Sequence, residues 1–178
     1  RNKLLAQQYQ ILVKLNENTP IAWEIKEIDN ENILQCFAEW VSVSYNPQVL
    51  NSLPNHCVMT KLFEYIQDNR HTSETSECLK ELVYQLRDPK EAPIFYDYMG
   101  KKMVELLSVI DYFIEQGEIG EAEDYLRIVV QFCRKSLNTL VSTFDDNIYT
   151  FLRRLTQYTE ENIVPIYDNF IEFWEEFV

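Results

Sequence analysis

The chain has 178 residues, of which 46% are hydrophobic and 25% charged, and its formal net charge is −13 at pH 7. The length suits one domain at the usual ~100–200 residues per domain, and the balance of apolar and charged residues excludes a disordered chain. The excess of acid repels phosphate backbones, so we expect no direct binding of nucleic acid. No apolar run approaches the ~20 residues of a membrane span, so we expect no membrane insertion.

Glycine is scarce, with only Gly100, Gly117 and Gly120 in the whole chain. Few positions can therefore supply the positive φ that hairpin turns require, and no stretch alternates with period two, so we predict no sheet. Apolar stripes recur about every twenty residues, which is half the ~40–47-residue period of HEAT-type helix pairs. We predict an all-α fold, an α-α superhelix of antiparallel HEAT-type helix pairs with about eight helices.

Four of these helices are expected before residue 90, at about 2–17, 30–41, 55–67 and 73–86. Asp29 is a candidate N-cap for the second helix, and Thr72 or Ser73 for the fourth, because their oxygens accept from free backbone N–H groups. Prolines 20 and 89 end the first and fourth helices, since proline cannot continue the hydrogen-bond ladder. A short turn around residues 49–50 is expected in the connection between the second and third helices.

The other four expected helices span about 93–116, 119–142, 145–155 and 163–178. Gly117 lies one residue past the fifth, where a left-handed cap belongs, and Asp145 is a candidate N-cap for the seventh. With Gly120, Gly117 lets the two longest helices fold back tightly on each other. The aromatic stripe of the last helix is interpreted as core rather than as a ligand groove.

The cysteines and histidines do not indicate a metal site, because no two of the four cysteines form a CxxC pair and the chain has only two histidines. We therefore expect no metal and no cofactor. Cys36, Cys78 and Cys133 fall within apolar stripes and are expected in the core, which implies a reducing compartment. His56, near a helix start, and His71, in a polar loop, are expected at the surface.

The sequence lacks the GxSxG, HExxH, GxxxxGK[ST] and GxGxxG patterns of common catalytic and nucleotide-binding sites. Paired carboxylates are abundant, but they fall at helix starts and in turns rather than in a dry pocket that would shift their pKa. Acids in a first turn stabilise the helix dipole by ~0.3–1 kcal/mol, which accounts for most of them. We predict that the chain is not an enzyme.

Three helical segments carry a resemblance that covers nearly all of the chain. They are ILQCFAEW at residues 33–40, YLRIVVQFC at 125–133 followed by Phe151-Leu152, and the closing FIEFW at 170–174. Their order and spacing resemble the transportin-SR type of importin, a branch of the importin-β superfamily that includes importin thirteen. The matching residues are mostly core residues, so the resemblance carries no cargo or Ran contact onto a named position.

The resemblance implies a single HEAT-repeat segment, residues 1–178 without separate domains, from a longer superhelical carrier. A start at Arg1 and an end at Phe177-Val178, inside an apolar pattern, agree with the expectation of a piece of a longer protein. Such carriers act as monomers, bind protein cargo inside the arch and contact the Phe-Gly repeats of nuclear pores. They exchange cargo in response to Ran-GTP and shuttle between cytoplasm and nucleus, most often in import.

The acidic balance suits basic cargo, and the turns on one face of a solenoid often form its binding rim. The candidate protein-binding residues are the acids of two expected turns: Glu118, Glu121, Glu123, Asp124, Glu160 and Glu161. Alternatively, these acids are solvated residues at the starts of helices and do not bind a partner. The alternatives for the whole chain are a scaffold or adaptor outside transport, an exportin, and an enzyme built on a helical bundle.

Overall fold

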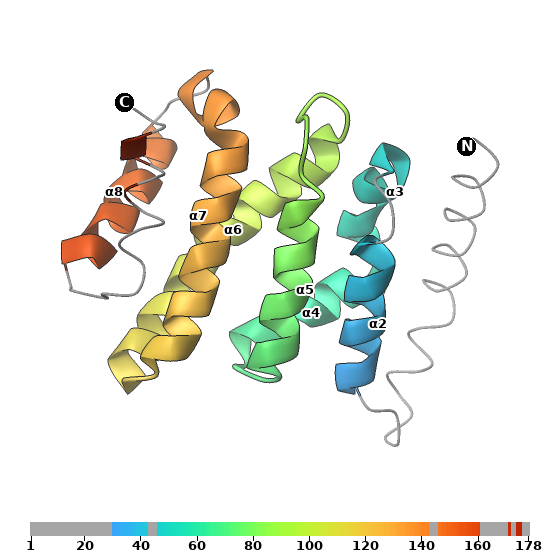
Figure 1. Ribbon diagram of the computed structural model, residues 1–178, viewed down its shortest axis with the longest axis horizontal. Helices are drawn as coiled ribbons and strands as arrows, with labels where there is room; N and C mark the ends of the chain where they lie inside the picture. The colour runs from blue at the N-terminus through green and yellow to red at the C-terminus, as the bar shows by residue number, and fades with distance from the viewer. Residues whose placement is uncertain (1–29, 43–45, 143–145, 161–170, 172–173, 176–178) are drawn as a thin grey trace. The chain divides into compact units, whose positions relative to one another are not determined.

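A computed structural model describes residues 30–42, 46–142, 146–160, 171, 174 and 175 (Figure 1). These residues form seven α-helices and one 3-10 helix, and no strand occurs among them. The all-α fold is therefore confirmed, whereas the HEAT superhelix stays a prediction. In chain order the elements are α2 (Asn30–Ser42), α3 (Pro47–Ser52), η1 (Leu53–Asn55), α4 (Cys57–Gln67), α5 (Thr72–Tyr84), α6 (Pro93–Gln116), α7 (Ile119–Ser142) and α8 (Asp146–Glu160).

The predicted bounds of the two longest helices are confirmed by α6 and α7, and the turn expected around residues 49–50 is the helix α3. Asn46 caps α3, because its Oδ1 accepts from the backbone N–H of Gln48 at 3.1 Å, and Pro47 then occupies the first turn. The helix predicted at 2–17 and the caps Asp29 and Asp145 lie outside the described residues, as does most of the helix predicted from 163.

The chain divides into two compact units, Arg1–Met99 and Gly100–Val178. We describe each unit by itself. That residues 1–178 form a single repeat segment without separate domains stays a prediction.

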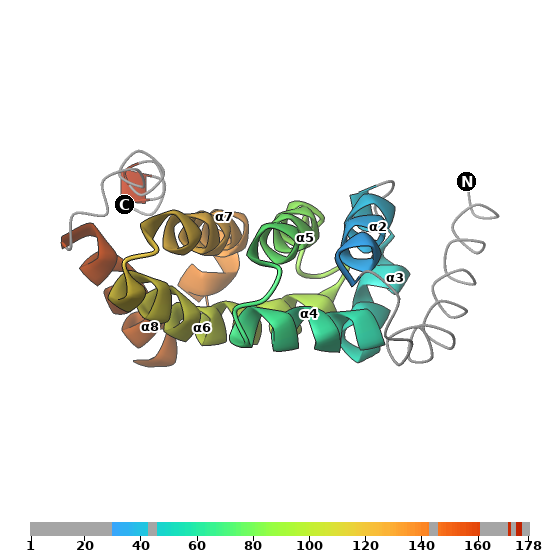
Figure 2. The ribbon, with the colours of Figure 1, turned by 90° about the horizontal axis from the view of Figure 1, so that it is seen from below.

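In the first unit, α2 and α5 lie side by side in one layer and α4 packs against both from the other layer (Figures 1 and 2). The helices meet through apolar side chains that are fully or almost fully buried, as expected for two amphipathic layers. They include Leu34 and Phe37 of α2, Met59, Leu62, Phe63 and Ile66 of α4, and Leu79 and Leu82 of α5.

Within this unit, Asn51 of α3 binds the start of α6. Its Oδ1 accepts from the backbone N–H groups of Ile94 at 3.0 Å and Phe95 at 3.3 Å, and its Nδ2 donates to the Glu91 carbonyl at 3.4 Å. The first turn of a helix has N–H groups without intrahelical acceptors, and here a residue from another element satisfies two of them. Asn51 thus acts as a cap supplied from more than forty residues away.

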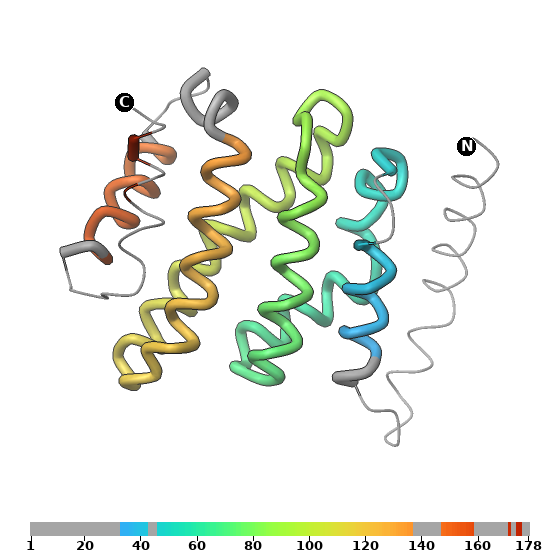
Figure 3. The backbone as a smooth tube through the Cα atoms, viewed as in Figure 1, coloured from blue at the N-terminus to red at the C-terminus, as the bar shows by residue number. Residues whose placement is uncertain are grey.

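In the second unit, α7 runs antiparallel to α6 (Figure 3). Phe113 near the end of α6 stacks on Tyr125 near the start of α7, with ring centroids 5.9 Å apart. Gly100, far back along α6, lies beside Phe132, which is further along α7. Contacts that advance along one helix while they retreat along the other define the antiparallel pair.

The turn between α6 and α7 closes at Gly117 as predicted, whereas Gly120 lies inside α7 without a left-handed φ and a Cβ there would meet nothing within 4 Å. Gly117 adopts φ +78°, its N–H donates to Ile114, and the N–H of Glu118 donates to the Phe113 carbonyl at 2.9 Å. This is a Schellman motif with glycine at the left-handed position. The end of α4 forms the same motif, with Asn69 at φ +53° in the left-handed position. This motif was not predicted, because the position holds asparagine rather than glycine.

Two predictions about caps and histidines are wrong. The fourth helix begins at Thr72 after His71, which has a left-handed φ of +54° and no side-chain cap hydrogen bond, so neither Thr72 nor Ser73 is the N-cap. His56 is buried, with 2% of its surface exposed, although a surface position was predicted. Its Nδ1 accepts from the Val58 N–H at 3.2 Å and its ring stacks on Phe37, so the imidazole replaces the usual short polar N-cap of α4.

Of the three cysteines predicted in the core, two are buried and one is exposed. Cys78 and Cys133 are buried as expected, and burial raises the pKa of both thiols. Cys36 is exposed, so its assignment to the core is wrong. The buried side chains of α2, among them Leu34 and Phe37, lie on one side of the helix, and a residue one position before Phe37 projects about 100° away from it.

Candidate acidic binding surface

Four of the predicted acids, Glu118, Glu121, Glu123 and Asp124, lie at the start of α7. The Glu118 carbonyl accepts from the Ala122 N–H at 3.2 Å, so Glu118 is the last residue before the helix and Glu121 stands in its first turn. Negative side chains there interact favourably with the positive end of the helix dipole. The turn that positions them is fixed by Gly117, because only the left-handed cap returns the chain so sharply.

The four predicted acids of this turn differ in exposure. Glu118 and Asp124 are exposed and Glu121 is half-buried. Glu123 is different, since its carboxylate pairs with the guanidinium of Arg127 one turn further along α7 and only 15% of its side chain is exposed. The structure therefore offers Glu118, Glu121 and Asp124 to a partner, and we call these three residues the acidic surface.

The second predicted turn is only partly described. Glu160 is the last residue of α8, and neither its side chain nor Glu161 belongs to the described residues. That Glu160 and Glu161 bind a protein partner therefore stays a prediction.

Sequence reasoning missed a polar cluster that fixes α8 on α6. The Tyr158 hydroxyl donates to Oδ1 of Asp111 at 2.6 Å and lies 3.2 Å from the Leu107 carbonyl, while Arg154 Nη2 pairs with Asp111 at 2.7 Å. Burial and then the hydrogen bond to Asp111 raise the pKa of Tyr158. The residues lie more than forty positions apart in sequence, so no local pattern indicates that they meet.

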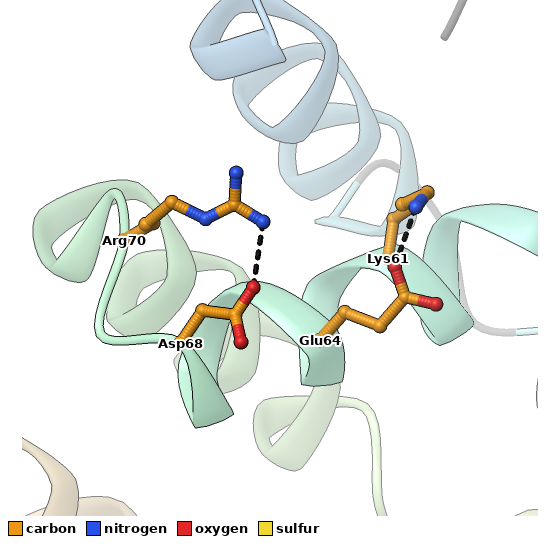
Figure 4. A network of polar contacts seen from close by, with 4 residues as sticks. All are labelled: Lys61, Glu64, Asp68 and Arg70. Atoms are coloured by element: carbon orange, nitrogen blue, oxygen red, sulfur yellow. Dashed lines mark hydrogen bonds and ion pairs between the residues drawn. The ribbon is translucent and has the colours of Figure 1, made fainter.

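Figure 4 shows polar contacts on the surface of the first unit, at the end of α4. Lys61 pairs with Glu64 at 2.5 Å, and Arg70 pairs with Asp68 at 2.7 Å while its guanidinium covers the Tyr65 ring at 4.7 Å. Exposed pairs of this kind contribute ~0–1 kcal/mol each, because both charges are well solvated when apart. None of the predicted binding residues belongs to the first unit.

The described residues contain no group of three or more His, Cys, Asp or Glu side chains placed to hold a metal ion. None of the helices in the described ranges is both long enough and apolar enough to cross a membrane. The acids at the start of α7 can attract basic side chains by charge. Among the other described polar residues, Asn51 and the group of Tyr158, Asp111 and Arg154 join separate helices.

Compared with known proteins, the chain matches no family model, no curated protein and no solved structure.

Proposed function

We propose that this chain binds basic protein segments through the acidic surface, as part of a helical-repeat nuclear transport receptor of the transportin-SR type acting in import. The observation that carries the proposal is the exposure of Glu118 and Asp124, with half-buried Glu121 between them in sequence, at the start of α7. The net charge of −13 supports it, because it attracts basic partners over a Debye length of ~8 Å at physiological salt.

The test is the affinity of a lysine- and arginine-rich peptide for a variant with Glu118→Lys, Glu121→Lys and Asp124→Lys. Exposed ion pairs contribute ~0.2–1 kcal/mol each, and reversal adds repulsion, so we expect the affinity to fall about tenfold or more. Fluorescence anisotropy at 50 mM salt measures it, and circular dichroism checks that the variant is folded.

A matched control carries the same change of charge in the other unit: Glu64→Lys, Glu77→Lys and Glu91→Lys. All three acids are exposed, so the substitutions change the net charge equally without touching the acidic surface. We expect this control to retain most of the affinity. Equal losses in both variants would mean that the peptide responds to net charge alone, and would refute a defined surface.

The alternatives differ in their response to Ran. A scaffold or adaptor outside transport has no reason to distinguish Ran-GTP from Ran-GDP, whereas an exportin binds cargo more tightly with Ran-GTP and an importin more weakly. Contact with the Phe-Gly repeats of nuclear pores and movement between cytoplasm and nucleus follow from the importin reading and are proposals with it.

A further inference from the structure

His56 lies where η1, α4 and α2 meet within the first unit. Its backbone N–H donates to the Leu53 carbonyl of η1 at 2.8 Å, and its own carbonyl accepts from the Met59 N–H of α4 at 3.0 Å. Its ring stacks on Phe37 of α2, with ring centroids 5.9 Å apart and an angle of 20° between the planes. This one residue therefore joins three elements, and only 2% of its surface is exposed.

The cap of α4 determines which nitrogen of this ring carries a proton. Nδ1 accepts from the backbone N–H of Val58 at 3.2 Å. A backbone N–H can only donate, so Nδ1 carries no proton and the proton of the neutral ring is on Nε2. A second proton would have to bind Nδ1, and the acceptor of the cap would then become a donor that faces the Val58 N–H.

The surroundings of the ring also disfavour a positive charge. The ring contacts described above, with Phe37 and with the Val58 N–H, supply no negative charge, and burial of an uncompensated charge is costly. The residues of α2, of α4 and of α5, which packs on both, that carry charge near neutral pH are Glu31, Glu39, Lys61, Glu64, Glu74, Glu77, Lys80 and Glu81. Lys61 pairs with Glu64 and Lys80 pairs with Glu77. Glu39 is exposed and lies about 200° around α2 from Phe37.

We propose that His56 makes the junction of η1, α2 and α4 sensitive to acid, because a proton on Nδ1 removes the cap of α4. An imidazole in the unfolded chain takes up its proton at about pH 6.5. The stabilisation that the neutral ring supplies is therefore complete well above pH ~6.5, and it is lost as the pH falls below that value. The inference does not depend on the proposed function, because it concerns contacts within the first unit alone.

The test compares the parent with His56→Asn between about pH 7.5 and about pH 5.5. Asparagine is a favoured N-cap, so it keeps an acceptor for α4, but it takes up no proton in this range. If only the unfolded chain binds the proton, linkage raises the equilibrium constant for unfolding about tenfold over the range. Urea unfolding followed by circular dichroism measures this constant, and we expect its rise to be about tenfold smaller in His56→Asn than in the parent.

The matched control is His71→Asn, which removes the other histidine of the chain. The His71 side chain makes no cap hydrogen bond, and its left-handed φ of +54° is one that asparagine adopts readily. This control should keep the rise of the parent. The same rise in the parent and in His56→Asn, or a reduction that only His71→Asn shows, would overturn the proposal.

A measurement on the parent decides the question even if His56→Asn does not fold. Nitrogen magnetic resonance of the imidazole rings at about pH 7.5 should show Nδ1 of His56 without a proton. On acidification, protonation of this ring should coincide with loss of the folded-state signal of the Val58 amide. Protonation that leaves the Val58 signal in place would show that the cap does not oppose it, and the proposal would be overturned.

Discussion

At the scale of single residues, Asn51 is a side chain that joins elements far apart in sequence. It satisfies two N–H groups at the start of α6 and donates to the loop before it, and so joins α3 to a helix far along the chain. Buried or partly buried N–H groups that lose an acceptor destabilise the fold by more than the lost bond itself.

We expect Asn51→Ala to lower the free energy of unfolding by about 1–2 kcal/mol, the usual loss when a helix cap is removed. Urea unfolding followed by circular dichroism measures the change. Asn55→Ala, at an exposed position at the end of η1, is the matched control and should change stability little. Equal effects of the two substitutions would show that the Asn51 cap contributes nothing of its own.

Residue chemistry also explains where sequence reasoning failed. His56 was expected at the surface, but its ring accepts from the backbone at the start of α4, a role that residue type alone rarely indicates. Asn69 occupies a left-handed position that glycine usually fills, so this turn gave no signal, whereas Gly117 was recognised by its place after a long apolar stripe.

At the scale of elements, the long helices could be predicted because their ends are set locally. The helix α6 begins at Pro93 and ends just before Gly117, and the apolar residues between them repeat with the helical period. The contacts between helices could not be predicted in this way. The pairing of Tyr158 with Asp111, for example, depends on packing between segments that are remote in sequence. The pairing of Glu123 with Arg127 is different, because its i,i+4 spacing on α7 is local and could have been read from the sequence, although Glu123 was placed among the available acids.

The free energy of unfolding should fall at alkaline pH, because buried tyrosines of the helices ionise there. Burial, and then the charge of Asp88, raise the pKa of Tyr96 to about 12, against an ordinary value near 10. The fold therefore favours the protonated phenol, and its stabilising effect is complete below about pH 10 and is lost as the pH rises towards 12. The raised pKa of Tyr158 acts in the same direction.

We expect the urea midpoint to fall as the pH rises from about 10 towards 12, and to fall less steeply in Tyr96→Phe, which has no phenol to ionise at that site. Tyr84→Phe, at a side chain with 62% of its surface exposed, is the control and should keep the parent's slope. A slope that is the same in Tyr96→Phe and in the parent would show that this phenol does not contribute to the alkaline loss.

At the scale of the whole molecule, the strongly acidic charge is the feature that bears on the choice of partner. Under the proposed function, the acidic surface at the start of α7 gives a basic partner a site within this acidic field. Neither the net charge nor the acidic surface requires catalysis, and both agree with the proposed role in reversible binding.

The central claim, reversible binding of basic cargo in nuclear import, is tested most directly by titrating a basic peptide into the chain in the presence of Ran loaded with GTP or with GDP. The account predicts that the peptide binds in the presence of Ran-GDP and binds more weakly in the presence of Ran-GTP. If Ran-GTP lowers the affinity for import cargo, then by linkage the cargo lowers the affinity for Ran-GTP by the same factor. The same affinity with both nucleotide forms, or a tighter complex with Ran-GTP, would contradict it.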